Sequence, residues 1–181
     1  MRSRYLIAVG GNVRHPRYGS PPKVLRAALR ALDGEKGIKL KAASRIVASA
    51  PLGPSQRRYA NAAVIVRSKL DPPALLARLQ AIEHRFARRR RGRRWGARTL
   101  DLDIVLWSMG AWASPGLAIP HPAYRTRGFV LAPALTIARD WRDPLTVLTI
   151  AHLAARLTRR TPLPIRQPGR ALSSVGRATD F

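Results

Sequence analysis

The chain of 181 residues predicts a single α+β domain, and three observations support this prediction. Hydrophobic residues make up 46% of the chain, as in folded globular proteins. The expected element order is strand, helix, strand, strand, helix, strand, with further helices at the end. This order is the split βαβ, or ferredoxin-like, pattern, in which helices cover one face of a mostly antiparallel sheet. The chain has no cysteine, which excludes disulfide scaffolds, thiol nucleophiles and cysteine-ligated metal sites.

The first half of the predicted sheet surrounds one helix. Tyr5–Val9 has the composition of a short buried strand and leads into a Gly-Gly-Asn turn. The next helix has a capping residue in Ser20, a proline in its first turn and a stop signal at Gly34. Two strands, Lys39–Ser49 and Ala60–Val66, are expected to follow.

A second helix, capped by Asp71, precedes the clearest strand of the chain. Gln80 and Glu83 are expected beside the buried stripe of this helix rather than on the stripe itself. The residues of that stripe have helical spacing: Leu75, Leu76, Leu79, Ile82 and Phe86. The strand Thr99–Trp107 then reads TLDLDIVLW. Strict alternation predicts one apolar face, formed by Leu100, Leu102, Ile104 and Leu106, and one face with Asp101 and Asp103.

The last third of the chain predicts a hairpin or loop and two helices. Ser108–Ile119 carries Gly and Pro, whereas Arg127–Ile137 and Leu145–Leu157 have helical patterns. Residues 161–181 combine Pro and Gly with little apolar periodicity. We therefore expect one domain over residues 1–160 and a disordered tail over 161–181.

The two aspartates of the predicted strand are candidate metal ligands. Residues i and i+2 project from the same face of a strand, about 6–7 Å apart. Mg²⁺ prefers oxygen ligands and is commonly held by one or two carboxylates together with substrate phosphates. A strand with a merely polar outer face is the alternative, although aspartate is disfavoured in strands.

Positive charge is concentrated beside these carboxylates. The chain has 34 basic and 9 acidic residues, so its formal net charge is +25, and eight of the fourteen residues from 85 to 98 are arginine. Arginine is always protonated and binds phosphate through two parallel hydrogen bonds. The excess can also be a solvated surface produced by codon bias, or the mark of a basic RNA-binding protein on the same scaffold.

Other polar and aromatic positions are weaker signals. Tyr59 and Asn61 should share a strand face, where they can stack on a flat heterocycle and hydrogen-bond its edge. His121, Arg127 and Phe129 follow in a loop and the start of a helix. The sequence lacks GxxxxGK[ST], HExxH and GxSxG, so the common families that carry these motifs are excluded.

Together these segments resemble 6-hydroxymethyl-7,8-dihydropterin pyrophosphokinases of folate biosynthesis. The resemblance covers about residues 4–157 and rests on PLGP, YANAAV, QAIE, RRRRGRRWGARTLDLDI and IPHPAYRTRGFVLAPAL, of which RWGARTLDLDI is the most specific. It departs from the family pattern at Gly11, Ala50 and Pro122, all in loops. The family has a ferredoxin-like fold and transfers pyrophosphate from ATP to the pterin hydroxymethyl group, releasing AMP.

The resemblance implies a role for each matching position. Asp101 and Asp103 would bind two Mg²⁺ ions, and Trp95 would anchor the arginine segment. Three arginines would contact the phosphates during transfer: Arg88, Arg90 and Arg98. Four residues besides Arg98 would line the ATP side: Gln80, Glu83, His121 and Arg127. The pterin would contact Leu52, Tyr59, Asn61 and Phe129.

These roles imply a cytoplasmic, Mg²⁺-dependent enzyme that uses ATP as co-substrate. We expect a monomer without nucleic-acid or membrane partners, since no apolar run approaches the roughly 18–20 residues of a membrane span. A relative that has lost catalytic activity, and the RNA-binding protein mentioned above, are the remaining alternatives.

Overall fold

The structure is a computed structural model that describes residues 2–49, 58–86 and 98–159. Its centre is an antiparallel sheet in the order β2-β4-β1-β5, and β3 pairs with β4 as well. The strands are β1 (Ser3–Gly11), β2 (Ile38–Ala43), β3 (Val47–Ser49), β4 (Tyr59–Ser68) and β5 (Asp101–Trp107). This strand order confirms the predicted ferredoxin-like α+β fold.

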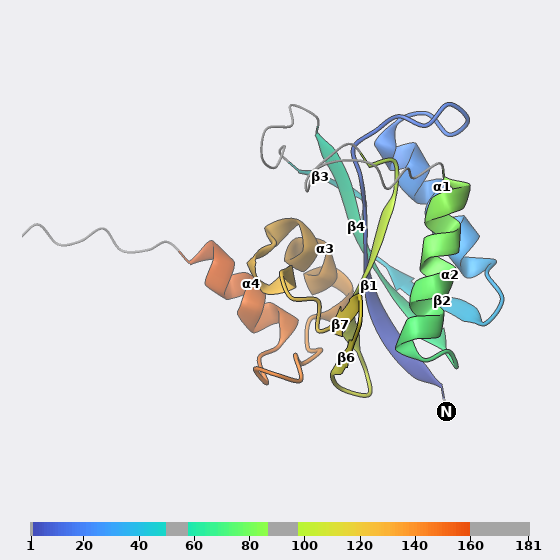
Figure 1. Cartoon of the computed structure of the whole chain (residues 1–181). Coiled ribbons are helices and arrows are strands. Elements are labelled where there is room, and N and C mark those ends of the chain that lie inside the picture. The colour runs from blue at the N-terminus through green and yellow to red at the C-terminus, as the bar shows by residue number, and fades with distance from the viewer. Residues whose placement is uncertain (1, 50–57, 87–97, 160–181) are drawn as a thin grey trace, which may run out of the picture.

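Helices cover both faces of this sheet, whereas the sequence predicted helices on one face. Helices α1 (Pro21–Asp33) and α2 (Pro72–Arg85) lie on one side, and α3 (Gly128–Ala138) and α4 (Ile150–Thr158) on the other (Figure 1). The side chains of Leu6 and Ile65 make the second face of the sheet apolar, and helices α3 and α4 bury this face. The protein therefore has three layers and two hydrophobic clusters.

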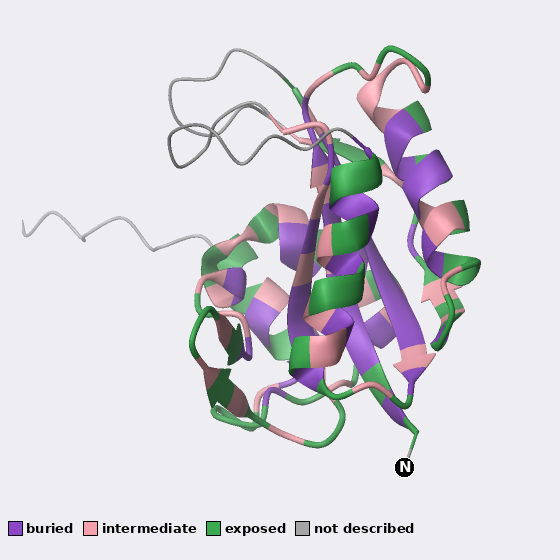
Figure 2. Cartoon of the chain, turned by 45° about the vertical axis from the view of Figure 1, so that its right-hand side comes forward, coloured by how far each residue is buried: buried purple, intermediate pink, exposed green. Residues whose placement is uncertain are grey.

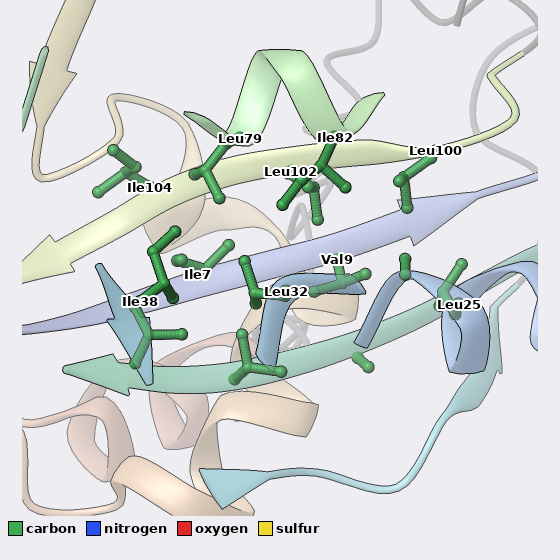
Figure 3. Packing of buried hydrophobic residues seen from close by; sticks show 14 of the residues in the cluster. Ile7, Val9, Leu25, Leu32, Ile38, Leu79, Ile82, Leu100, Leu102 and Ile104 are labelled. Carbon is green, nitrogen blue, oxygen red and sulfur yellow. The ribbon is translucent and has the colours of Figure 1, made fainter. Parts of the chain in front are cut away.

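The larger cluster lies between the sheet and the first two helices. Figure 3 shows Ile7 and Val9 of β1 packed against Leu25 and Leu32 of α1, and Figure 2 shows the buried face of each helix turned to the sheet. Fully burying one such side chain contributes about 1.5–3 kcal/mol to folding. The smaller cluster joins Leu6 and Ile65 to helices α3 and α4.

The two helices of the larger cluster begin differently despite similar sequences. The Asp71 carboxylate accepts a hydrogen bond of 2.9 Å from Ala74 N, which confirms the predicted cap of α2. Ser20 occupies the same position before α1, but its side chain makes no capping hydrogen bond. Both helices have proline in the first turn, where a missing N–H leaves nothing unsatisfied.

A β-bulge in β5 changes which side chains face each cluster. The pairing of β1 with β5 runs from Leu6 opposite Leu106 directly to Ile7 opposite Ile104, so Val105 is the extra residue. Leu106 therefore lies in the smaller cluster, not with Leu102 on the side of α2 as the alternation predicted.

The predicted strand Lys39–Ser49 is divided into β2 and β3. Between them Ser44 binds Ala63 of β4 through both its backbone N–H and its side-chain oxygen, each at 2.9 Å. The side chain thus replaces one ladder bond, and the strand is interrupted at that point.

The C-terminal elements follow the predicted order with different bounds. The hairpin is formed by β6 (Trp112–Ser114) and β7 (Leu117–Ile119), and a 3-10 helix, η1 (Tyr124–Thr126), leads into α3. Helix α4 begins at Ile150 rather than at Leu145, because Thr149 caps it through a hydrogen bond from His152 N. Among the described residues no helix is long and apolar enough to cross a membrane, and the predicted tail lies outside those residues.

Candidate active site

A pocket lies over the end of the sheet where β1, β4 and β5 meet the first turn of α3. It brings together eight of the residues that the sequence indicated: Tyr59, Asn61, Arg98, Asp101, Asp103, His121, Arg127 and Phe129. These come from two strands, three connecting segments and a helix, so only the tertiary structure makes them neighbours. Its floor is formed by small residues of β1 from Ala8 to Gly11.

The two carboxylates stand on one face of β5, as predicted. Asp101 pairs with Gly10 of β1, and Asp103 pairs with Ala8. Since those partners carry almost no side chain, the space beside both carboxylates stays open. Both aspartates are partly buried, which places anionic oxygens in a pocket where electrostatic interactions are stronger than in bulk water.

Arg98 is held at this pocket through both its backbone and its side chain. Its guanidinium forms an ion pair with Asp101. Its backbone N–H donates to Asn12 Oδ1 at 2.8 Å, and its carbonyl accepts from Asn12 N at 2.8 Å. Burial lowers the pKa of Arg98, but the charge of Asp101, the hydrogen bond to Asp101 and the nearby Asp103 and Tyr59 together outweigh burial and raise the pKa above its ordinary value. The side chain therefore stays a cation at the pocket.

Gly11 is one of the departures from the family pattern, and the structure explains it locally. A Cβ atom at this position would lie 2.4 Å from the carbonyl oxygen of Thr99. This close approach allows the chain before β5 to bind the end of β1 through Arg98 and Asn12. Any larger residue at position 11 would require the segment at Thr99 to shift.

Tyr59, Asn61 and Phe129 provide the aromatic and amide groups of the pocket. Asn61 is 4% exposed, and its Nδ2 donates to Ser49 Oγ on β3 at 2.8 Å, which fixes the orientation of the amide. Phe129 lies in the first turn of α3, and the guanidinium carbon of Arg127 stands 5.8 Å from its ring centroid. Two aromatic rings and an oriented amide are a suitable set for a flat heterocycle.

His121 presents one defined ring nitrogen as a donor. Its Nδ1 accepts a hydrogen bond of 3.2 Å from Ala123 N, so the neutral ring carries its proton on Nε2. Burial lowers the pKa of His121, and the charge of Arg127 lowers it further, whereas Asp103 acts in the opposite direction. The neutral Nε2–H form is thereby favoured.

Two of the residues assigned to the ATP side do not line this pocket. Gln80 and Glu83 lie on α2, which packs on the other side of the sheet. Glu83 was expected beside the buried stripe of α2, but it is itself buried, with an exposed fraction of 2%. Its Oε1 accepts a hydrogen bond from Leu102 N at 2.7 Å. Leu102 stands between the two aspartates, so this bond supports the strand that carries them.

Four other predicted positions lie outside the described residues: Leu52, Arg88, Arg90 and Trp95. Sequence reasoning in turn missed Asn12 and Ser49, which orient Arg98 and Asn61. The turn signal Gly-Gly-Asn marked the position of Asn12, but nothing local indicated that its partner stands 86 residues away.

Comparison with known proteins agrees with this geometry. The sequence model of the family described as 7,8-dihydro-6-hydroxymethylpterin-pyrophosphokinase (HPPK) matches residues 6–139. The chain belongs to the HPPK family. All residues that line the pocket fall within the matched span. This membership makes the chain a pyrophosphokinase of folate biosynthesis.

Individual relatives cover most of the chain. A 2-amino-4-hydroxy-6-hydroxymethyldihydropteridine pyrophosphokinase of Synechocystis is 38% identical over 148 residues, which are 82% of this chain and 73% of the relative. Proteins of the same name from Pseudomonas aeruginosa and Haemophilus influenzae are 39% and 40% identical. They cover 80% and 74% of this chain, and 86% and 81% of their own lengths.

Proposed function

We propose that this chain transfers the pyrophosphoryl group of ATP to the hydroxymethyl oxygen of 6-hydroxymethyl-7,8-dihydropterin and releases AMP. One observation carries the proposal: a single pocket holds two carboxylates and three cationic or donor groups beside an aromatic pair with an oriented amide. The charged groups suit a metal-bound triphosphate, and the aromatic pair suits the bicyclic pterin. A site for only one of the two substrates would not need both.

The pterin would lie between Tyr59 and Phe129, with Asn61 at its polar edge. The hydrogen bond to Ser49 orients the Asn61 amide in advance, which lowers the entropy lost on binding. The ring faces contribute stacking, and the amide selects a heterocycle with paired donors and acceptors. Leu52, the other expected pterin contact, is outside the described residues.

The phosphates would contact Arg98, Arg127 and the Nε2–H of His121. Arg98 is already charged and held by Asn12, so it needs little reorganisation when phosphate binds. Arg88 and Arg90 are proposed to add positive charge, although they lie outside the described residues. For Gln80 and Glu83 a contact to ATP remains a prediction that the pocket does not support.

The donor set fits Mg²⁺. Two partly buried carboxylates face one pocket, and no cluster of three or more His, Cys, Asp or Glu side chains suited to a metal occurs among the described residues. A cation bound here would therefore be completed by phosphate oxygens and water, which is the usual coordination of Mg²⁺. We propose two ions held by Asp101 and Asp103. When bound, the ions supply charge neutralisation for the phosphates.

The reaction itself needs no covalent intermediate. The hydroxymethyl oxygen forms a bond to the β-phosphorus of ATP while the bond from that phosphorus to the α,β-bridging oxygen breaks. AMP leaves with the electron pair, and the hydroxyl proton is lost to solvent. The protein has to hold both substrates in line and stabilise negative charge, and Arg98, His121 and Arg127 are placed to do so.

Release of AMP tests the proposal directly. Purified protein with ATP and Mg²⁺ should release AMP only when 6-hydroxymethyl-7,8-dihydropterin is added, and chelation of the metal should stop the release. The RNA-binding alternative predicts tight RNA binding whose affinity falls steeply with salt, and no AMP. Pterin-independent AMP release, or none at all, would contradict the proposal.

The remaining properties follow the family resemblance. We propose a monomeric, cytoplasmic enzyme that has the pterin and ATP as its partners and no nucleic-acid ligand. The carboxylates of β5 support the last point, because they place negative charge on the sheet face that an RNA-binding protein of this fold would use for bases.

A further inference from the structure

Asp143 is a fully buried carboxylate outside the pocket. It follows α3 in the chain, has an exposed fraction of 0%, and lies beyond the residues that the family model matches. Burying an isolated carboxylate costs several kcal/mol, so such a group is retained only where its partners hold it. Those partners connect it to two residues of the site.

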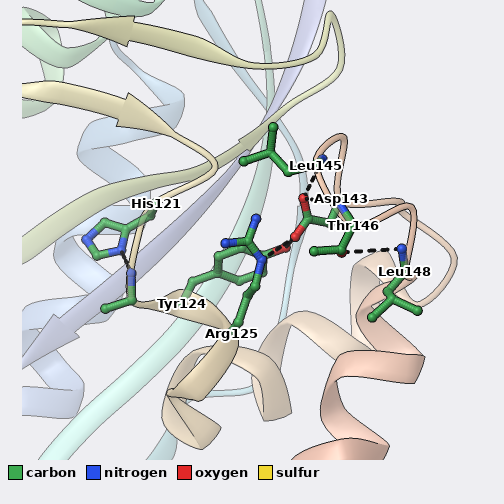
Figure 4. Close-up of polar contacts among 8 residues, drawn as sticks. His121, Tyr124, Arg125, Asp143, Leu145, Thr146 and Leu148 are labelled. Carbon is green, nitrogen blue, oxygen red and sulfur yellow. Dashed lines mark hydrogen bonds and ion pairs between the residues drawn. The ribbon is translucent and has the colours of Figure 1, made fainter.

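The two oxygens of Asp143 bind two different segments. Oδ1 accepts from Leu145 N at 2.8 Å and Thr146 N at 3.4 Å, which shapes the turn before α4. Oδ2 accepts from Tyr124 Oη at 2.8 Å and from Arg125 Nε at 2.5 Å (Figure 4). Burial raises the pKa of this carboxyl, but the hydrogen bonds from Arg125, Leu145 N and Tyr124 outweigh burial and hold the pKa well below its ordinary value.

Tyr124 connects this carboxylate to the pocket. Its backbone N–H donates to the carbonyl of His121 at 3.1 Å, and its own carbonyl accepts from Arg127 N at 3.1 Å. The residue is 1% exposed, and its ring belongs to the smaller hydrophobic cluster. His121 and Arg127 are therefore both hydrogen-bonded to the backbone of Tyr124. Asp143 binds the side chains of Tyr124 and of its neighbour Arg125.

We infer that Asp143 is a positioning residue for the nucleotide side of the site. It holds Tyr124 and Arg125, and through them it sets the separation and direction of His121 and Arg127. The inference rests on the proposed function in one respect: His121 and Arg127 are taken as ATP contacts. Of the proposed pterin contacts, Tyr59 and Asn61 come from β4 and do not depend on this segment, whereas Phe129 follows Arg127 at the start of α3 and contacts its guanidinium.

Three variants test the inference, with binding rather than turnover as the measurement. Asp143→Asn keeps the size of the side chain but places an amide where Tyr124 and Arg125 donate. Tyr124→Phe removes only the hydroxyl that reaches Asp143. Asp140→Asn is the matched control, since it removes the same charge from an exposed residue of the same connecting segment.

Calorimetric titration with Mg²⁺ and a non-hydrolysable ATP analogue should show binding weaker by roughly tenfold in Asp143→Asn. This is the effect of losing one charge-assisted hydrogen bond between the phosphates and a displaced His121 or Arg127. Tyr124→Phe should weaken nucleotide binding less, and Asp140→Asn should bind as the unmodified protein does. Pterin affinity should fall clearly less than nucleotide affinity in Asp143→Asn and Tyr124→Phe, because among the described pterin contacts only Phe129 touches this segment, whereas Tyr59 and Asn61 lie on β4.

A purely structural role for Asp143 gives a different result. Folded Asp143→Asn would then melt at a lower temperature and bind the nucleotide analogue with unchanged affinity, which would overturn the inference. Equal loss of pterin and nucleotide affinity would overturn it as well. If Asp143→Asn does not fold, unchanged nucleotide affinity in Tyr124→Phe decides against the inference. Failure of the unmodified protein to bind the analogue would contradict the proposed function instead.

Discussion

Asp101 and Asp103 stand in different surroundings although they share one face of β5. Asp101 forms an ion pair with Arg98, and both aspartates act electrostatically on Arg98 and His121, with Asp103 acting more strongly than Asp101 on His121. The pair therefore balances the cations of the pocket before any substrate binds. Removing either carboxylate should not disturb the fold, but the pocket would then carry an excess of positive charge.

We predict that Asp101→Asn and Asp103→Asn each lower turnover by at least ~10²-fold, because one electrostatic contact to a transition state is commonly worth ~3 kcal/mol. Pterin affinity should change little, since Tyr59 and Asn61 contact the other substrate. Steady-state AMP release and pterin titration measure the two effects, and Asp140→Asn controls for the loss of charge. Full activity in both variants would show that these carboxylates do not hold the metal.

Glu83 offers a second test at the scale of one residue. Its buried Oε1 accepts from Leu102 N, which points away from β1 at the edge of the sheet. Glu83→Ala leaves that N–H without its acceptor and should lower the free energy of unfolding by about 1–3 kcal/mol. Glu83→Gln keeps an amide oxygen and should cost less. Urea unfolding measures both, and equal stability of Glu83→Ala and the unmodified protein would contradict this role.

At the scale of elements, the two helices on the first face differ at their N-termini. Asp71 caps α2 by a hydrogen bond to Ala74 N, and Ser20 makes no such bond at α1. Both were expected from the sequence to cap, because serine and aspartate are equally suitable at this position. The backbone is nearly the same at the two positions, with φ −67° and ψ 157° at Ser20 and φ −71° and ψ 168° at Asp71, so the side-chain conformation decides which oxygen reaches the first turn.

We therefore predict unequal costs for two similar substitutions. Asp71→Ala should destabilise the protein by about 1 kcal/mol, and Ser20→Ala by only a few tenths. The two variants serve as controls for each other, since each removes one candidate N-cap from a helix that has proline in its first turn. Chemical denaturation gives both values, and a larger loss in Ser20→Ala than in Asp71→Ala would contradict the assignment of the caps.

At the scale of the whole molecule, the net charge of +25 is the dominant electrostatic property. Only nine acidic residues oppose it, and several of them are committed to specific partners such as Arg98 and Arg125. Like charges on a compact chain repel each other, and dissolved salt screens this repulsion.

The melting temperature should accordingly rise when NaCl is increased from ~10 mM to ~300 mM, because the screening length falls from about 30 Å to below 8 Å. Differential scanning calorimetry without substrates measures the effect. A melting temperature that falls over this range would indicate that local ion pairs, such as Arg125 with Asp143, outweigh the general repulsion.

The sequence by itself determined the element order, the family resemblance and most of the residues of the pocket. Periodicity identifies a strand or helix wherever side chains alternate between water and a core, and TLDLDIVLW alternates over its first half. The motif RWGARTLDLDI predicted Arg98, Asp101 and Asp103 in one site, and all three line the pocket. These features are local, so local sequence is sufficient to predict them.

Only the tertiary structure decided how these elements face one another. The bulge at Val105 turned Leu106 to the second cluster, and burial against β5 placed Glu83 where its Oε1 accepts a hydrogen bond from Leu102 N. The connection from Asp143 through Tyr124 to His121 spans three segments that have no common pattern. Each depends on which backbone and side-chain groups remain unsatisfied once the layers pack, and that is a property of the whole fold rather than of any one segment.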